Sequence, residues 1–151
     1  MTKRKVLFLC TGNSCRSQMA EAIVNTRLGE EWQAFSAGTR PADYVHPKAL
    51  EVLAEIGIPH RGSPKNVDEL RHNHFDLVVT LCDSAAEECP LWLGVNRRVH
   101  LGFPDPAKAT GSEDQILDVF RQVRNEIIQK VPELLNSHNT DLRGKSFAYN
   151  G

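Results

Sequence analysis

The amino-acid sequence predicts an α/β fold in which helices cover both faces of a four-stranded parallel sheet. Three observations support this prediction. Short apolar runs alternate along the chain with segments of helical period, a pattern typical of right-handed βαβ units. The strongest runs are almost continuously apolar, as parallel strands buried on both faces are. A chain of 151 residues is long enough for one domain with a sizeable core.

The first half of the chain contributes two strands and two helices. The apolar run at residues 5–10 is the first strand, and residues 17–28 carry apolar side chains at helical spacing before Gly29. A short second strand follows at residues 32–36. Residues 47–56 are expected to form the next helix, which has a proline in its first turn and a glycine after its last residue.

The second half supplies the other strands and helices. A short helix is expected at residues 67–71, and residues 75–82 are rich in β-branched side chains, which favours a buried strand. Residues 97–101 form the fourth strand. The longest helix spans residues 113–135, carries an apolar stripe, and should be disturbed near its end by Pro132.

Composition and charge limit the domain organisation and the classes of partner. Residues 1–137 are expected to form one domain. The polar segment 138–151 has no periodicity and is expected to form a flexible C-terminal tail. The net charge of −1 gives no indication of a nucleic-acid partner. No apolar run reaches the roughly 18 residues of a membrane span, and the first run is too short for a signal sequence. We therefore expect a monomeric, cytoplasmic protein that binds neither nucleic acid nor membrane.

The segment from Cys10 to Arg16 carries the strongest functional signal. An apolar strand runs into a cysteine, and five small or polar residues separate it from an arginine that opens a helix. Glycine and asparagine accept left-handed φ, so Gly12 and Asn13 allow the loop to turn successive N–H groups inward toward an anion. The helix N-terminus and the planar guanidinium favour the same anion, and together they favour the thiolate of Cys10. The predicted oxyanion-binding residues are Thr11, Gly12, Asn13, Ser14, Cys15 and Arg16.

Two more residues fit displacement at a bound oxyanion. Ser17 either hydrogen-bonds the thiolate or caps the helix. Asp105 lies between two prolines after the fourth predicted strand, where it suits a general acid that protonates a leaving oxygen; an ordinary turn aspartate is the alternative. Because the carboxyl ends of parallel strands share one sheet edge, Cys10, Cys82 and Asp105 should converge there.

The remaining cysteines indicate redox chemistry. In a reducing compartment, Cys82 and Cys89 are more typical of a relay than of a static disulfide. In a continuous helix these two positions would be roughly 10 Å apart, whereas a disulfide allows about 7 Å between Cα atoms, so bridging them requires a local rearrangement. Cys15 is expected to point into the core and to take no chemical step. The cysteine spacings match no standard zinc pattern, and His46 and His60 are more typical of surface or cap residues than of ligands.

At this point the motifs resemble those of the thioredoxin-coupled arsenate reductases, which share the fold of low-molecular-weight protein tyrosine phosphatases. The resemblance covers residues 5–135. The matching segments are Leu-Cys-Thr-Gly-Asn-Ser-Cys-Arg-Ser-Gln-Met-Ala-Glu (9–21), Ser-Ala-Gly (36–38), His-Pro-Lys-Ala (46–49), Asp-Leu-Val-Val-Thr-Leu-Cys (76–82), Glu-Cys-Pro (88–90) and Phe-Pro-Asp-Pro-Ala (103–107).

The resemblance implies a three-cysteine mechanism. Cys10 attacks arsenate while Asp105 protonates the leaving oxygen. Cys82 then attacks Cys10, arsenite leaves, and Cys89 carries the disulfide outward to thioredoxin. Some members also bind potassium through residues that match Asn13, Glu21, Ser36 and the loop near Ser63. Here Lys65 replaces a carboxylate of that pattern, and because its ammonium can take the place of the cation, no metal requirement is predicted.

Two other functions remain open from the sequence. A phosphatase acting on phosphotyrosine or a small phosphoester would use the same loop, although Ala107 and Lys108 follow Asp105 where such enzymes have tyrosines. A metalloid or redox sensor would use the thiols to signal to a partner without turnover. The cysteine pair Cys82 and Cys89 favours the reductase.

Overall fold

The computed structural model describes residues 3–81 and 97–141, with side chains described as far as Ser137. Its sheet contains four parallel strands in the order β2-β1-β3-β4. These strands are β1 (Arg4–Cys10), β2 (Trp32–Gly38), β3 (Leu77–Thr80) and β4 (Arg98–His100). The predicted fold class is therefore confirmed, and each strand lies within or close to its predicted range.

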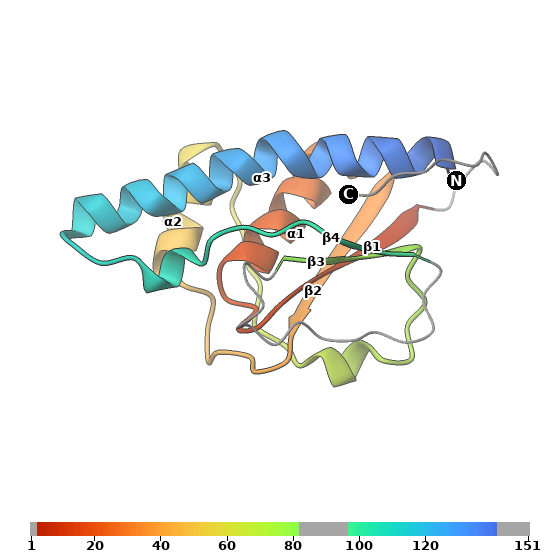
Figure 1. The fold of residues 1–151 in the computed structure, drawn as a ribbon, viewed down its shortest axis with the longest axis horizontal. Helices are drawn as coiled ribbons and strands as arrows, with labels where there is room; N and C mark the ends of the chain where they lie inside the picture. The colour runs from red at the N-terminus through yellow and green to blue at the C-terminus, as the bar shows by residue number, and fades with distance from the viewer. Residues whose placement is uncertain (1–2, 82–96, 142–151) are drawn as a thin grey trace.

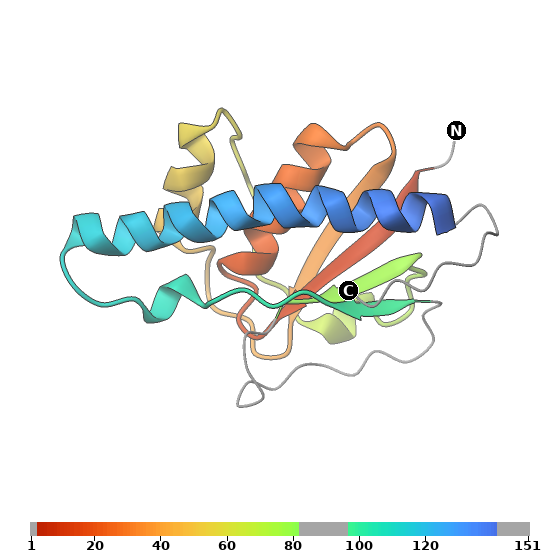
Figure 2. The same cartoon turned by 45° about the horizontal axis from the view of Figure 1, so that its top comes forward.

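Helices lie on both sides of the sheet, with the α-helices on one side and a short 3-10 helix on the other (Figure 1). The described helices are α1 (Arg16–Arg27), α2 (Pro47–Glu55), α3 (Glu113–Asp141) and the 3-10 helices η1 (Val67–Leu70) and η2 (Pro106–Lys108). The three α-helices cover one face, and α3 packs across both α1 and α2 (Figure 2). On the other face, η1 packs against β2.

Helix α3 continues past its predicted end. It runs through Pro132 to Asp141, so residues 138–141 are helical where a tail was expected. Proline removes one backbone hydrogen bond, but Val131, Leu134 and Leu135 are buried around it, and their packing keeps the helix in place. Residues 142–151 lie outside the described residues, and the division into a domain and a tail stays a prediction. Within the described ranges, no helix combines the length and hydropathy needed to cross a bilayer.

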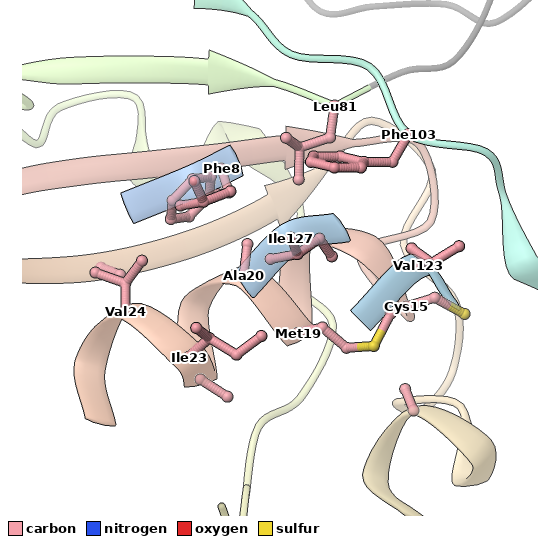
Figure 3. Packing of buried hydrophobic residues seen from close by; sticks show 14 of the residues in the cluster. Phe8, Cys15, Met19, Ala20, Ile23, Val24, Leu81, Phe103, Val123 and Ile127 are labelled. Carbon is pink, nitrogen blue, oxygen red and sulfur yellow. The ribbon is translucent and has the colours of Figure 1, made fainter. Parts of the chain in front are cut away.

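The alternation of side chains along β1 builds a core on each face of the sheet. Val6 and Phe8 belong to the larger core, which they share with residues of α1 and α3. Figure 3 shows Phe8 in this cluster. Leu7 and Leu9 point to the opposite face, where they pack with Val67 of η1 and other apolar residues. All four β1 side chains are fully buried, which explains why this strand is a continuous apolar run.

Strand β1 is also where the strand order reverses. The chain passes from β1 to β2 on one side and later to β3 on the other. Ligands of parallel α/β sheets bind outside the carboxyl ends of the strands at such a point. Cys10 is the last residue of β1, and α1 begins at Arg16, so the predicted oxyanion loop lies at this position.

An ion-pair network joins the C-terminal end of α2 to α3. Glu55 at the end of α2 accepts hydrogen bonds from Arg121 Nη2 at 2.7 Å and Arg124 Nη1 at 2.6 Å. Arg124 Nη1 also donates to the carbonyl oxygen of Val52 at 2.9 Å. The hydrogen bond from Arg121 is the main reason that the pKa of Glu55 lies below its ordinary value. These contacts fix α2, whose N-terminus borders the oxyanion loop.

The core predicts which positions of α3 control stability. Replacing the fully buried Ile127 (I127A) should lower the free energy of unfolding by about 2–5 kcal/mol, because transfer free energy is lost and a cavity remains. The matched control Q129A changes an exposed residue of the same helix and should change stability by less than about 0.5 kcal/mol. Urea unfolding followed by circular dichroism measures both. Equal effects of the two substitutions would contradict the packing of α3 described here.

Candidate active site

The loop after β1 turns its carbonyl groups outward. The carbonyl oxygen of Thr11 accepts from Arg40 N at 2.9 Å, and that of Gly12 accepts from Ala42 N at 2.9 Å. The carbonyl oxygen of Asn13 accepts from Gln18 Nε2 at 3.1 Å, and that of Ser14 accepts from His46 N at 3.1 Å. No described peptide bond is cis, and in a trans peptide the C=O and the following N–H point in opposite directions. The N–H groups of residues 12–15 therefore point away from these partners, into the loop, as an anion site requires.

Two small residues permit this geometry. Asn13 has a φ of 49° and is the one non-glycine residue with positive φ in the described part of the chain; Gly12, predicted to share this conformation, does not. Gly38 at the end of β2 lies against the loop, where an added Cβ would come within 2.4 Å of the Thr11 carbonyl oxygen. Only glycine allows the end of β2 to approach the loop this closely.

The Cys10 sulfur ends a chain of hydrogen bonds that starts at Lys65. The backbone N–H of Lys65 donates to Asn13 Oδ1 at 2.9 Å, and Asn13 Nδ2 donates to Ser17 Oγ at 2.8 Å. Ser17 Oγ lies 2.9 Å from Cys10 Sγ. Because the serine oxygen already accepts from Asn13, its own proton is directed at the sulfur, where it stabilises a thiolate. The N-cap position of α1 belongs to Cys15, so the hydroxyl of Ser17 contacts the sulfur and does not cap the helix.

Arg16 and Asp105 lie together beside the loop. The Arg16 side chain is 3% exposed, and its Nη1 donates to the carbonyl oxygens of Leu81 at 3.4 Å and Phe103 at 3.2 Å. Its Nη2 lies 3.6 Å from Asp105 Oδ2. The other carboxylate oxygen, Oδ1, accepts from Ala107 N at 3.0 Å and caps η2. The tertiary fold thus brings the predicted arginine and aspartate to one place although they are far apart in sequence.

Cys15 differs sharply from Cys10. Its side chain is buried in the core cluster that also contains Met19 and Val123 (Figure 3). Burial raises the pKa of this thiol to about 12, with smaller contributions from Asp105 and Cys10. At neutral pH it is therefore a protonated thiol and a poor nucleophile.

A cavity of about 530 Å³ opens over the loop. Cys10, Arg16 and Asp105 all line it. Its other wall comes from the segment before α2, including Tyr44, which is 65% exposed, and His46. Neither residue was predicted to belong to the site from the sequence. The sequence indicated only that His46 precedes the proline that opens α2. In the structure His46 caps this helix, because its Nδ1 accepts from Lys48 N at 3.1 Å.

The residues expected to bind potassium surround a lysine. Lys65 Nζ lies 3.3 Å from the carbonyl oxygens of both Ser36 and Ser63. Glu21 Oε1 accepts from Ser36 Oγ at 2.8 Å. A fixed ammonium group therefore lies among oxygens that would otherwise be ligands.

Two predicted site residues, Cys82 and Cys89, lie outside the described residues. The last described group before them is Leu81, whose carbonyl oxygen accepts from Arg16. Leu81 N donates to Leu9 O at 2.8 Å, one residue before Cys10. The described chain thus reaches the edge of the oxyanion loop directly before Cys82.

Comparisons of the sequence and of the structure with known proteins agree with one another. The model of the low molecular weight phosphotyrosine protein phosphatase family matches residues 5–144. An arsenate reductase of Halalkalibacterium halodurans is 46% identical over 87% of this chain and 94% of its own length. The solved structure of an arsenate reductase in the phosphate-binding state is 30% identical, covers 89% of this chain and 98% of that one, and gives a TM-score of 0.75.

A thioredoxin-dependent arsenate reductase of Corynebacterium glutamicum, also of known structure, is 28% identical, with a TM-score of 0.58. The match covers 89% of this chain and 63% of that protein. The resemblance predicted from the sequence motifs is confirmed by these similarities. The chain therefore belongs to the low molecular weight phosphotyrosine protein phosphatase family.

Proposed function

We propose that this chain is an enzyme that reduces arsenate to arsenite. The observation that carries the proposal is the position of Cys10, which lines one cavity with Arg16 and Asp105 and whose sulfur lies 2.9 Å from Ser17 Oγ. Relatives that are 42–46% identical to this chain are named arsenate reductase, which supports arsenate as the oxyanion.

In the first step, the Cys10 thiolate attacks the arsenic atom of arsenate held by the loop N–H groups and Arg16. A sulfur–arsenic bond forms, and the bond from arsenic to one of its hydroxyl groups breaks. Asp105 Oδ2 supplies the proton with which this group leaves as water. The loop N–H groups are already oriented by the contacts of their carbonyls, so they stabilise the charge on the remaining oxygens without rearrangement.

In the second step, the Cys82 thiolate attacks the Cys10 sulfur. The sulfur–sulfur bond forms as the sulfur–arsenic bond breaks, and its electron pair stays on arsenic, which leaves as arsenite. Cys89 then attacks Cys82, which releases Cys10 as a thiolate and leaves a Cys82–Cys89 disulfide. Two thiols are oxidised and one arsenic atom is reduced by two electrons, so the electrons balance.

Thioredoxin is the proposed reductant of the Cys82–Cys89 disulfide. A dithiol protein returns both cysteines to thiols by the same exchange chemistry, and a solved relative is described as thioredoxin-dependent. A reducing compartment is needed to keep Cys10 reduced, and this requirement supports the cytoplasm as the location. The monomeric state and the lack of nucleic-acid and membrane partners stay predictions.

Hydrolysis of a phosphoester is the second candidate function. The same loop fits phosphate, which has the shape and charge of arsenate. The specific observation in its favour is Tyr44, whose largely exposed ring lines the cavity and offers an apolar surface to an aryl group. This activity needs Cys10, Arg16 and Asp105 but neither Cys82 nor Cys89, so the two functions separate experimentally.

A potassium ion does not fit the site that the family pattern implies. Lys65 Nζ already lies 3.3 Å from two of the oxygens that would bind the ion, and two positive charges would repel each other there. We propose that the ammonium of Lys65 takes the place of the cation and helps to hold the segment whose backbone N–H orients Asn13.

The relay is tested by C82S. Steady-state arsenate reduction with thioredoxin, thioredoxin reductase and NADPH should fall at least about 100-fold, because the sulfur–arsenic adduct no longer has a thiol to attack it. Hydrolysis of p-nitrophenyl phosphate should persist, since it does not use Cys82. Arsenate turnover at the wild-type rate in C82S would contradict the relay.

The role of Asp105 is tested by D105N. The amide cannot donate the leaving-group proton, so kcat should fall by about 100-fold or more while inorganic phosphate still protects Cys10 from iodoacetamide. D114N changes an exposed carboxylate at the start of α3 and serves as the control. An unchanged kcat in D105N would show that a group other than Asp105 donates the leaving-group proton.

The cation proposal is tested by K65A. Loss of the ammonium should lower the melting temperature by about 3 °C, and potassium chloride should restore it while choline chloride does not. The wild-type chain should melt at the same temperature in both salts. If potassium chloride raised the melting temperature of the wild-type chain and choline chloride did not, Lys65 would not replace the ion.

A further inference from the structure

We propose that His46 contacts the substrate and that its Nε2–H donates a hydrogen bond to the oxyanion bound in the Cys10–Arg16 loop. The inference deepens the proposed function, on which it rests, by adding a donor from the opposite wall of the cavity. It starts from the place of the His46 side chain, which lines the cavity together with Cys10 and Asp105.

The cap of α2 fixes which ring nitrogen carries the proton. Nδ1 of His46 accepts a hydrogen bond from Lys48 N at 3.1 Å, so it carries no proton. In the neutral ring the proton is then on Nε2, which is a donor. The Nε2–H takes no part in the cap, and we infer that it serves a ligand of the cavity that His46 lines.

Two further contacts hold the residue in place. The ring packs against that of Phe120, with centroids 4.7 Å apart and planes at 41°. Its backbone N–H donates to the carbonyl oxygen of Ser14 at 3.1 Å, within the oxyanion loop. His46 is therefore attached to the loop through its backbone and to α2 and α3 through its ring, and a donor fixed in this way loses little entropy when a ligand binds.

The surroundings keep the ring neutral. Burial, and then the charge of Lys48, lower the pKa of His46 below its ordinary value, while Asp105 opposes this shift. Protonation would place a hydrogen on Nδ1 facing the N–H of Lys48 and break the cap. The neutral ring is consequently both the form that caps α2 and the form that offers one N–H to the anion.

The variant H46N tests the proposal because it separates the two roles. Asparagine is a preferred N-cap residue and accepts from the same backbone N–H groups, but its side chain is shorter and does not reach as far into the cavity. Half-protection of Cys10 from iodoacetamide requires a certain concentration of inorganic phosphate or arsenate. Loss of one hydrogen bond to the charged ligand should raise this concentration about tenfold. The control H74N alters a histidine that is 65% exposed and does not line the cavity, and protection should not change.

Nuclear magnetic resonance of the wild-type chain gives a second measurement that needs no variant. The Nε2 resonance of His46 should shift as inorganic phosphate is added, and that of His74 should not. Unchanged protection in a folded H46N, or a His46 resonance that does not move at saturating phosphate, would overturn the proposal. If H46N weakens protection and the wild-type His46 resonance shifts, but the wild-type protein reduces no arsenate, the proposed function is refuted and the His46 contact stands.

Discussion

The site depends on the hydrogen bonds that hold the four carbonyl groups of residues 11–14 outward. A buried carbonyl without a partner costs free energy, so the loop adopts the conformation in which all four are satisfied. Three of the donors are backbone N–H groups of the segment between β2 and α2, and the fourth is Gln18 of α1. The anion-binding N–H groups are the other ends of the same peptide units. The cradle is therefore set by contacts on its outer side, before any anion binds.

Asn13 connects this outer support to the chemistry. Its left-handed backbone turns the loop, and its amide accepts from Lys65 N and Gln18 Nε2 while it donates to Ser17. With the oxygen occupied, the amide has one orientation, and that orientation sends the serine proton to the Cys10 sulfur. Buried networks are stable when each member is satisfied, and here Ser17 Oγ accepts from Asn13 and lies 2.9 Å from the Cys10 sulfur. The backbone N–H of Lys65 is thus connected to the Cys10 sulfur through the side chains of Asn13 and Ser17.

The sequence predicted the oxyanion loop and the convergence of Cys10 and Asp105 at one sheet edge, but not all the residues that line the cavity. The strand at β1, the loop and the start of α1 are consecutive, and their residue types are enough to indicate an oxyanion site. Asp105 was predicted from its prolines and its place after a strand, which is also local information. Tyr44 and His46 were not assigned to the site, because their place in the cavity depends on the pairing of β2 with β1 and on the packing of α2 against α3. The end of α3 was misjudged for a similar reason: buried side chains around Pro132 outweigh its local preference.

The contrast between Cys10 and Cys15 bears on where the reducing electrons come from. Both thiols line one cavity, and their charges act on each other, so proximity alone would make Cys15 a candidate to attack an adduct on Cys10. Thiol–disulfide exchange needs a thiolate, however, and a pKa of about 12 leaves roughly one part in 100,000 of Cys15 ionised at pH 7. Burial therefore makes Cys15 a poor nucleophile despite its place beside Cys10. The proposed attack by Cys82 does not rely on Cys15, and Cys82 directly follows Leu81, which is bonded to both Arg16 and Leu9.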